Sequence, residues 1–127
     1  MIPSEIAGSR YISLATFRRD GTAVPTPVWA VADGDELLVW TREDSGKAKR
    51  IRNGNRVTVT PCDARGHTAE GAQAAEGTAR LLPEPGGLGR VRKAMTRKYG
   101  WQFRLIDSGG ALLRGGKRPH LGIAVTL

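Results

Sequence analysis

The chain has 127 residues, 39% of them hydrophobic and 25% charged, a composition that excludes a disordered or membrane-embedded protein and predicts a single domain over residues 1–127. Twenty Lys and Arg residues against twelve Asp and Glu give a net charge of +8, which favours anionic partners. No window is apolar enough to span a membrane, no secretory signal opens the chain, and a lone cysteine excludes an internal disulfide, so we expect a cytoplasmic protein with no membrane partner.

The first third of the chain predicts three short strands joined by tight turns. Residues 11–18 alternate in polarity and are rich in β-formers, and an Asp-Gly turn signal separates them from a second strand over residues 24–31. Pro25 and Pro27 lack amide donors, so the second strand is expected at a sheet edge or at a bulge. A third strand over residues 37–41 completes an antiparallel meander.

The remainder of the chain predicts two helices, each followed by one or two strands. A helix of about two turns is expected after Ser45, with Ala48 and Ile51 on its buried face. A second helix is expected over residues 88–99. Further strands are expected over residues 56–64, 67–84 and 121–127. This order predicts a mostly β fold, a six-stranded antiparallel barrel with short helices at its openings.

Motifs for several enzyme classes are absent. The sequence has no CxxC, HExxH, G-x-S-x-G, GxxxxGK[ST] or GxGxxG pattern. His67 and His120 are far apart and are expected to be ordinary surface or loop histidines, so no metal site is expected. Cys62 is expected to be a small buried hydrophobic residue rather than a nucleophile. If the chain is an enzyme, a bound cofactor is expected to carry most of the chemistry.

The stretch TREDSGKAKRIRNGNRVTV, residues 41–59, carries six basic residues. Free amide groups at the start of the predicted helix, the Ser45 hydroxyl and Thr41 at the end of the preceding strand make a candidate anion site. The helix presents cations on both of its flanks: Lys47, Lys49, Arg50 and Arg52. This arrangement suits a phosphate with an extended acidic tail, and a solvated basic helix remains the alternative.

A second candidate feature is the segment TPVWAV. Val28 and Trp29 face opposite ways in a strand, so one of them points into the core and the other could line a flat pocket for a ring system. Trp40 lies beside Thr41 on the neighbouring strand. Apolar and aromatic surface beside a phosphate site suits a flavin-like ligand, and simple core roles for the two tryptophans are the alternative.

Residues 11–82 resemble the pyridoxamine 5′-phosphate oxidase-like split β-barrel family, also called the FMN-binding split barrel. The shared marks are "LATF..DGT…TPVW", "LLVWT", "SGKAKRIRNGNRV" and "AEGTARLL". Within the family the sequence is most similar to the actinobacterial branch that uses the deazaflavin coenzyme F-420 instead of FMN. The resemblance implies a split β-barrel homodimer with two cofactor sites at the subunit interface.

The resemblance also implies which residues hold the cofactor. Its phosphate and acidic tail are expected to meet Thr41, Ser45, Lys47, Lys49 and Arg50. Its ring is expected to lie along Pro27, Val28 and Trp29. No catalytic residue is carried over, and the substrate-phosphate arginine pattern of true pyridoxamine phosphate oxidases is absent, which argues against vitamin B6 as substrate.

These expectations favour an oxidoreductase that binds coenzyme F-420 and transfers hydride to or from a small molecule. One alternative is an FMN-dependent oxidase or reductase of the same fold. Another is a non-enzymatic protein that binds a cofactor or nucleic acid. Base-stacking aromatics are absent from residues 42–56, which argues against nucleic acid.

Overall fold

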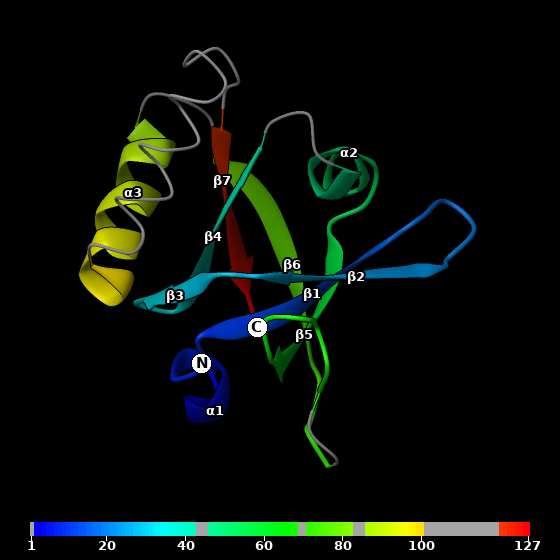
Figure 1. Ribbon diagram of the computed structural model, residues 1–127. Coiled ribbons are helices and arrows are strands. Elements are labelled where there is room, and N and C mark those ends of the chain that lie inside the picture. The colour runs from blue at the N-terminus through cyan, green and yellow to red at the C-terminus, as the bar shows by residue number, and fades with distance from the viewer. Residues whose placement is uncertain (1, 43–45, 69–70, 83–85, 101–119) are drawn as a thin grey trace.

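Helices interrupt a series of strands in the part of the chain that the computed structural model describes, residues 2–42, 46–68, 71–82, 86–100 and 120–127 (Figure 1). The helices in these ranges are α1 (Ser4–Ala7), α2 (Gly46–Asn53) and α3 (Gly86–Tyr99). The strands are β1 (Tyr11–Phe17), β2 (Ala23–Val28), β3 (Ala30–Asp33), β4 (Glu36–Arg42), β5 (Arg56–Cys62), β6 (Ala75–Leu82) and β7 (His120–Thr126).

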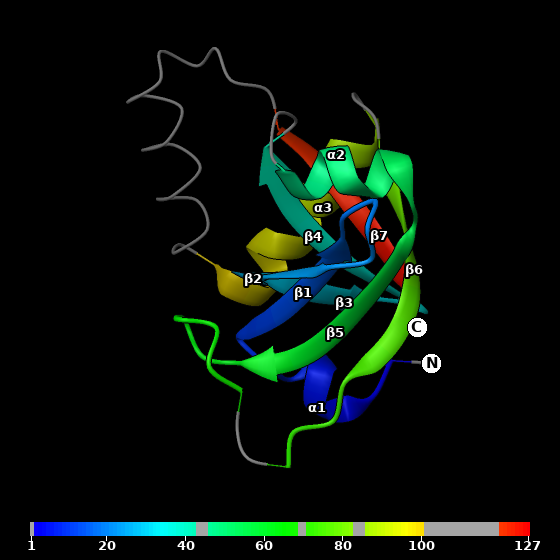
Figure 2. The same ribbon diagram turned by 90° about the vertical axis from the view of Figure 1, so that its right-hand side faces the viewer.

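The strands form one antiparallel sheet in the order β2-β1-β5-β6-β7-β4-β3. Its two edge strands, β2 and β3, are consecutive in the chain and are separated only by Trp29. Figure 1 shows them as one extended segment crossing the front of the rolled sheet, and Figure 2 shows the same sheet turned by 90°, with β5 in front. The first half of this segment pairs with β1 and the second half pairs with β4, so a continuous piece of backbone links the two edges of the barrel.

The barrel interior is filled by residues that alternate along the strands, as a period of two requires. Ile12 and Leu14 of β1 are both 0% exposed, and the same alternation recurs in the other strands. The cluster comprises Ile6, Ile12, Leu14, Val28, Ala30, Leu37, Val39, Ile51, Val57, Val59, Ala79, Ile123 and Val125. The Ile51 side chain of α2 belongs to this cluster, so α2 closes one end of the barrel.

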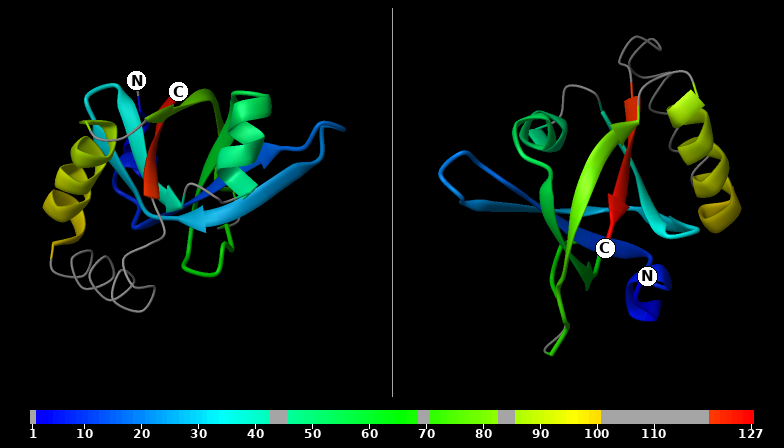
Figure 3. Two further views of the ribbon diagram at one scale, coloured as in Figure 1. Left: turned by 90° about the horizontal axis from the view of Figure 1, so that it is seen from above. Right: turned by 180° about the vertical axis from the view of Figure 1, so that it is seen from behind.

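A second apolar cluster lies outside the barrel, between the sheet and α3. Figure 3 shows α3 lying against the outside of the sheet. Val91 and Met95 of α3, both 0% exposed, pack in it with Leu38 of β4 and Ala124 of β7. Gly122 of β7 permits this close approach, because a Cβ atom there would lie 2.4 Å from Cγ2 of Val91. The helix therefore covers a face of the sheet that would otherwise expose apolar side chains.

The mostly β antiparallel fold with short helices is confirmed, but the expected count of six strands is wrong. Pairing changes partner at Trp29, so the single strand expected over residues 24–31 is two strands that pair with different neighbours. The expected edge position of the proline-containing strand is confirmed, since β2 ends the sheet.

One strand boundary and one helix also differ from expectation. The strand expected over residues 67–84 begins only at Ala75, because the chain after β5 turns on Asp63, whose Oδ1 accepts the backbone N–H groups of Arg65 and His67 at 2.9 Å. The short helix α1 had no counterpart in the sequence reading. In the described ranges, no helix has the length and apolar character needed to cross a membrane.

Candidate functional site

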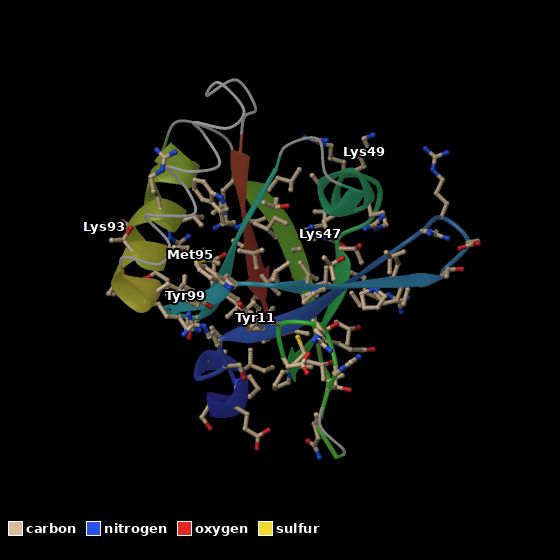
Figure 4. All side chains as sticks on the ribbon, viewed as in Figure 1. Tyr11, Lys47, Lys49, Lys93, Met95 and Tyr99 are labelled. Atoms are coloured by element: carbon tan, nitrogen blue, oxygen red, sulfur yellow. The ribbon has the colours of Figure 1, made fainter. Side chains whose placement is uncertain are left out.

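Helix α2 has a buried face and a cationic face. Ala48 and Ile51 are 0% and 6% exposed, which confirms the predicted apolar stripe. Lys47 is half-buried and Lys49 is exposed. In Figure 4, Lys47 is labelled on the side of α2 nearer β2, and Lys49 on the side away from it. The residues of α2 include no carboxylate, so the helix offers an anion several cations and no repelling acid.

Arg50 of α2 points toward the barrel rather than into solvent. Its Nε donates a hydrogen bond to Oγ1 of Thr16 on β1, at 2.5 Å. Thr16 is 1% exposed, so the bond satisfies a hydroxyl that the barrel would otherwise bury without a partner. Arg50 thus fastens α2 to β1 and keeps its charge at the end of the barrel.

Thr41 lies at the far end of β4, one residue before the strand ends, and pairs with Leu121 of β7. Its side chain is 6% exposed. Ser45, expected to cap α2, lies outside the described residues. Thr41 and the cations of α2 therefore lie on either side of residues 43–45, which are outside the described ranges.

Val28 and Trp29 face opposite clusters, as a strand requires. Val28 is 8% exposed and belongs to the barrel interior, so only its backbone can face a ligand. Trp29 is half-buried and packs against the outer cluster beneath α3. Pro27 is exposed on the edge strand. Of these three residues, Pro27 and Trp29 keep side-chain surface that a flat ring could contact.

The Trp29 ring is fixed by aromatic neighbours. It stacks on Tyr99 of α3, with ring centroids 4.3 Å apart and an interplanar angle of 13°. Tyr11 of β1 meets it edge-on at 6.3 Å. Trp40 is also half-buried against the same cluster, with the Arg92 guanidinium 5.2 Å from its ring centroid. Both tryptophans thus have packing roles, and Trp29 is held in a defined orientation.

Two polar groups at the end of α3 hold the chain at the junction of β2 and β3, next to Trp29. The Tyr99 hydroxyl accepts the Ala30 N–H at 3.1 Å and lies 2.8 Å from the carbonyl oxygen of Arg10. Lys98 Nζ donates to the carbonyl oxygens of Ser9 and Ala30, both at 2.7 Å. Burial raises the pKa of Tyr99 to about 12 and lowers the pKa of Lys98.

The sequence predicted a helix over residues 88–99, which ends at Tyr99, but it indicated neither the polar role of Tyr99 nor any role for Lys98. The helical spacing signals that Tyr99 faces inward. Nothing local signals that its hydroxyl meets Ala30, which lies 69 positions away in the chain.

The expected cofactor residues fall into two groups on opposite sides of β4. The cations belong to α2, whereas the Trp29 ring stacks on Tyr99 of α3. Figures 1 and 3 show these two helices on opposite sides of β4. The groups are linked through the sheet: Arg50 bonds to β1, and β1 pairs with Pro27 and Val28 of β2. Pro27 pairs with Ser13, three positions along β1 from Thr16, the partner of Arg50, and the Trp29 ring faces α3 instead.

The remaining candidates do not form a reactive centre. Cys62 is partly exposed, so its expected burial is wrong, and desolvation raises the pKa of its thiol, which disfavours the reactive thiolate. It lines a pocket of about 880 Å³ between α1 and the loop after β5. The His67 side chain is 76% exposed beside Asp63, at 3.7 Å. In the ranges described, no three His, Cys, Asp or Glu residues gather as metal ligands.

The donor set around α2 fits a phosphate-bearing ring cofactor. Ammonium and guanidinium groups and a threonine hydroxyl are the usual partners of phosphate oxygens. The neighbouring β2 edge offers backbone carbonyl groups but no amide donor at Pro25 or Pro27. A ring carrying N–H groups can bond to such an edge, which offers acceptors at these two positions and no competing donors.

Comparison with solved structures places this fold among proteins of varied description. A conserved hypothetical protein from Mycobacterium tuberculosis is 25% identical, with a TM-score of 0.65, and the match covers 98% of this chain and 79% of that one. A protein described as an F-420 reductase is 19% identical, with a TM-score of 0.60 and coverage of 98% and 94%. A heme storage protein from Vibrio cholerae is 11% identical, with a TM-score of 0.67 and coverage of 97% and 84%.

No curated protein matches the sequence. The family model described as pyridoxamine 5′-phosphate oxidase, in contrast, matches residues 2–118. That range includes the barrel strands from β1 to β6, the cations of α2 and the junction of β2 and β3 at Trp29. On this match, together with the seven-stranded split barrel, the chain belongs to the pyridoxamine 5′-phosphate oxidase family.

Proposed function

We propose that this chain is an oxidoreductase that binds the deazaflavin coenzyme F-420 and transfers hydride to or from a small molecule. The family takes its name from an oxidase of the flavin type, and one structural neighbour is described as an F-420 reductase. The proposal further places two cofactor sites at the interface of a homodimer, as the family resemblance implies.

The observation that carries the proposal is the charge of α2 and its position. The helix carries Lys47, Lys49, Arg50 and Arg52 and no acid, and it closes the barrel end beside the exposed edge strand β2. Coenzyme F-420 bears a phosphate and a tail of glutamates, so it is more anionic than FMN. An open row of cations attracts such a ligand over distances comparable to the Debye length and loses that attraction in salt.

The residues of this chain bind and orient the cofactor. Lys47, on the side of α2 facing β2, is suited to the phosphate, and the exposed Lys49 is suited to the tail. Arg50, already bonded to Thr16, adds charge without needing to be ordered by the ligand. The cofactor ring is expected to lie along Pro27 and Trp29, and stacking on Tyr99 fixes the orientation of the Trp29 side chain. When bound, the coenzyme supplies the hydride-carrying ring, and the protein sets its distance to the substrate.

FMN is the competing cofactor, because it shares the family fold and needs only one compact phosphate site. A non-enzymatic binding role is the second competitor, since one neighbour is described as a heme storage protein. Titrating the purified protein with coenzyme F-420, FMN and heme, each at low and moderate salt, separates the three. We expect tightest binding of coenzyme F-420, weakened by salt.

The matched variants sharpen the test. Lys47→Ala combined with Lys49→Ala should weaken binding of coenzyme F-420 by about tenfold or more, the loss expected for charge-assisted contacts. Lys93→Ala combined with Arg97→Ala removes the same charge from the exposed face of α3 and serves as the control. Equal affinity in both double variants, or preference for FMN in the parent protein, would reject the proposal.

A further inference from the structure

A second cationic surface lies at the opposite end of α2, where the β1–β2 turn meets the start of β5. It is a pocket of about 250 Å³. Its lining residues are Phe17, Arg18, Arg19, Gly21, Gly54 and Arg56. Three of these six residues are arginines and none carries a carboxylate. The pocket therefore concentrates positive charge in a small concave space.

The arginines of this pocket are set on ordered backbone. The Arg18 N–H donates to the Thr22 carbonyl and the Gly21 N–H donates to the Arg18 carbonyl, both at 2.9 Å. Gly21 has φ of 90°, which favours glycine at this position of the turn. Arg56 is the first residue of β5, and its Cζ lies 4.1 Å from the Phe17 ring centroid. This cation–π contact holds the Arg56 guanidinium over the pocket.

None of these three arginines forms an ion pair within the described part of the chain. The nearest acid on the turn, Asp20, is not among the lining residues. Its Oδ1 accepts the Thr22 N–H at 2.9 Å, and this bond lowers the pKa of Asp20. Its carboxylate is thus engaged with the turn, and the electrostatic influence of Arg18 on it does not amount to a paired contact.

We propose that this arginine pocket binds the phosphate or carboxylate groups of a compact polyanion. Like charges brought together without an acid repel one another, and a bound anion removes that repulsion. Guanidinium groups bind phosphate and carboxylate through two parallel hydrogen bonds. Ligand pockets for whole drug-sized molecules begin at roughly 300 Å³, so this pocket suits an anionic group and not an entire flavin.

The pocket is distinct from the cofactor-phosphate position proposed above. That position lies near the start of α2, whereas Gly54 follows its last residue. Eight helical residues separate the two ends by roughly 12 Å. The anionic groups have two possible sources: the acidic tail of the proposed coenzyme, which rests on the proposed function, or a separate phosphorylated or polycarboxylate molecule, which does not.

The test follows amide resonances of ¹⁵N-labelled full-length protein during titration with inorganic pyrophosphate. We expect the Gly21 and Gly54 amides to shift and saturate together. Arg18→Ala combined with Arg56→Ala should weaken that response by about tenfold or more, whereas the control Lys93→Ala with Arg97→Ala should retain it. Unshifted Gly21 and Gly54 amides, or a response equally weak in both double variants, would overturn the proposal.

Repeating the titration with coenzyme F-420, with and without its glutamate tail, identifies the source. Shifts of Gly21 and Gly54 that require the tail assign the pocket to the coenzyme. Shifts caused by pyrophosphate and by neither coenzyme form assign it to a separate anion. The pyrophosphate result stands even if the protein does not bind coenzyme F-420, so failure of the pocket and failure of the proposed function give different results.

Discussion

The α2 side and the α3 side of the barrel use positive charge in different ways. On the α3 side, Arg90 bonds to Asp33 at 2.9 Å and to Glu36 at 3.0 Å, and Arg80 joins the same Glu36 at 3.0 Å. Lys98 is surrounded by backbone carbonyl groups. On the α2 side, Arg50 meets a neutral hydroxyl, and the arginines of the β1–β2 turn have no ion pair within the described ranges.

This difference separates structural charge from charge that is available to a ligand. On the α3 side, Arg90 is neutralised by Asp33 and Glu36 and ties α3 to the β3–β4 turn, and Arg80 of β6 shares Glu36. The cations of the arginine pocket are ordered but not neutralised, and α2 brings no acid of its own. Substitutions that break these ion pairs on the α3 side should therefore change stability, and substitutions of the α2 cations should change ligand binding.

Tyr99 gives the largest expected effect on the α3 side. Tyr99→Ala removes the ring stacked on Trp29 and the partner of the Ala30 N–H, and it should lower the free energy of unfolding by about 3–5 kcal/mol. Tyr99→Phe keeps the ring and should lower it by about 1–3 kcal/mol, because the buried N–H loses its acceptor. Urea denaturation measures both changes. If the phenylalanine variant were as stable as the parent, the hydrogen bond between the Tyr99 hydroxyl and Ala30 would not stabilise the fold.

The ionisation of Tyr99 provides a second test without altering the ring. Its pKa is raised from 10.0 to about 12 in the folded protein, so above pH 10 the unfolded chain loses this proton first. Tyr99 should therefore stabilise the fold fully below pH 10, and that stability should fall by about 1.4 kcal/mol per pH unit up to about pH 12. Urea denaturation from pH 9 to pH 12 should show this slope in the parent, and Tyr99→Phe should lack it.

Glu36 gives a smaller effect, because its ion pairs are partly exposed. Its side chain is 20% exposed, and the hydrogen bond from Arg90 is the main cause of its lowered pKa. Glu36→Gln should lower the free energy of unfolding by about 1 kcal/mol at neutral pH. A lowered carboxylate pKa stabilises above the ordinary value of 4.5 and is lost as the pH falls. The gap between parent and variant should therefore narrow in acid, and a gap independent of pH would contradict this account.

Lys49 should give the smallest change in stability and so shows the contrast between the two sides. Lys49→Ala removes an exposed cation from α2 and should change the free energy of unfolding by less than about 0.5 kcal/mol. The same variant should still weaken binding of coenzyme F-420. A thermal melt together with a cofactor titration on one preparation checks both statements. A large loss of stability would place Lys49 with the structural charges instead.

Local chemistry made most of the fold predictable. The spacing of Ala48 and Ile51 identified the buried face of α2, and the prolines of β2 identified a sheet edge. The division of this segment at Trp29 was not predictable, because the sequence of residues 24–31 is typical of one unbroken strand. What divides it is a choice of partners, β1 for one half and β4 for the other, and pairing over such distances leaves no local signature.

The candidate site was predictable only in part for the same reason. The cations of α2 follow one another in the sequence, so their gathering is visible there. The orientation of Trp29 toward α3 depends on Tyr99, 70 positions later in the chain. The arginine pocket joins Phe17, Arg18 and Arg19 to Arg56, and only the pairing of β1 with β5 brings them together.

The position of β7 within the sheet has a consequence for synthesis on the ribosome. This strand lies between β6 and β4 and pairs with both, Glu36 opposite Thr126 and Thr78 opposite Thr126. Until residues 120–126 have left the exit tunnel, the nascent chain holds two partial sheets, β2-β1-β5-β6 and β4-β3, each with an exposed edge. Such edges invite pairing with other chains. Closure of the barrel should therefore follow the emergence of β7, and until then the exposed edges should depend on chaperones for protection.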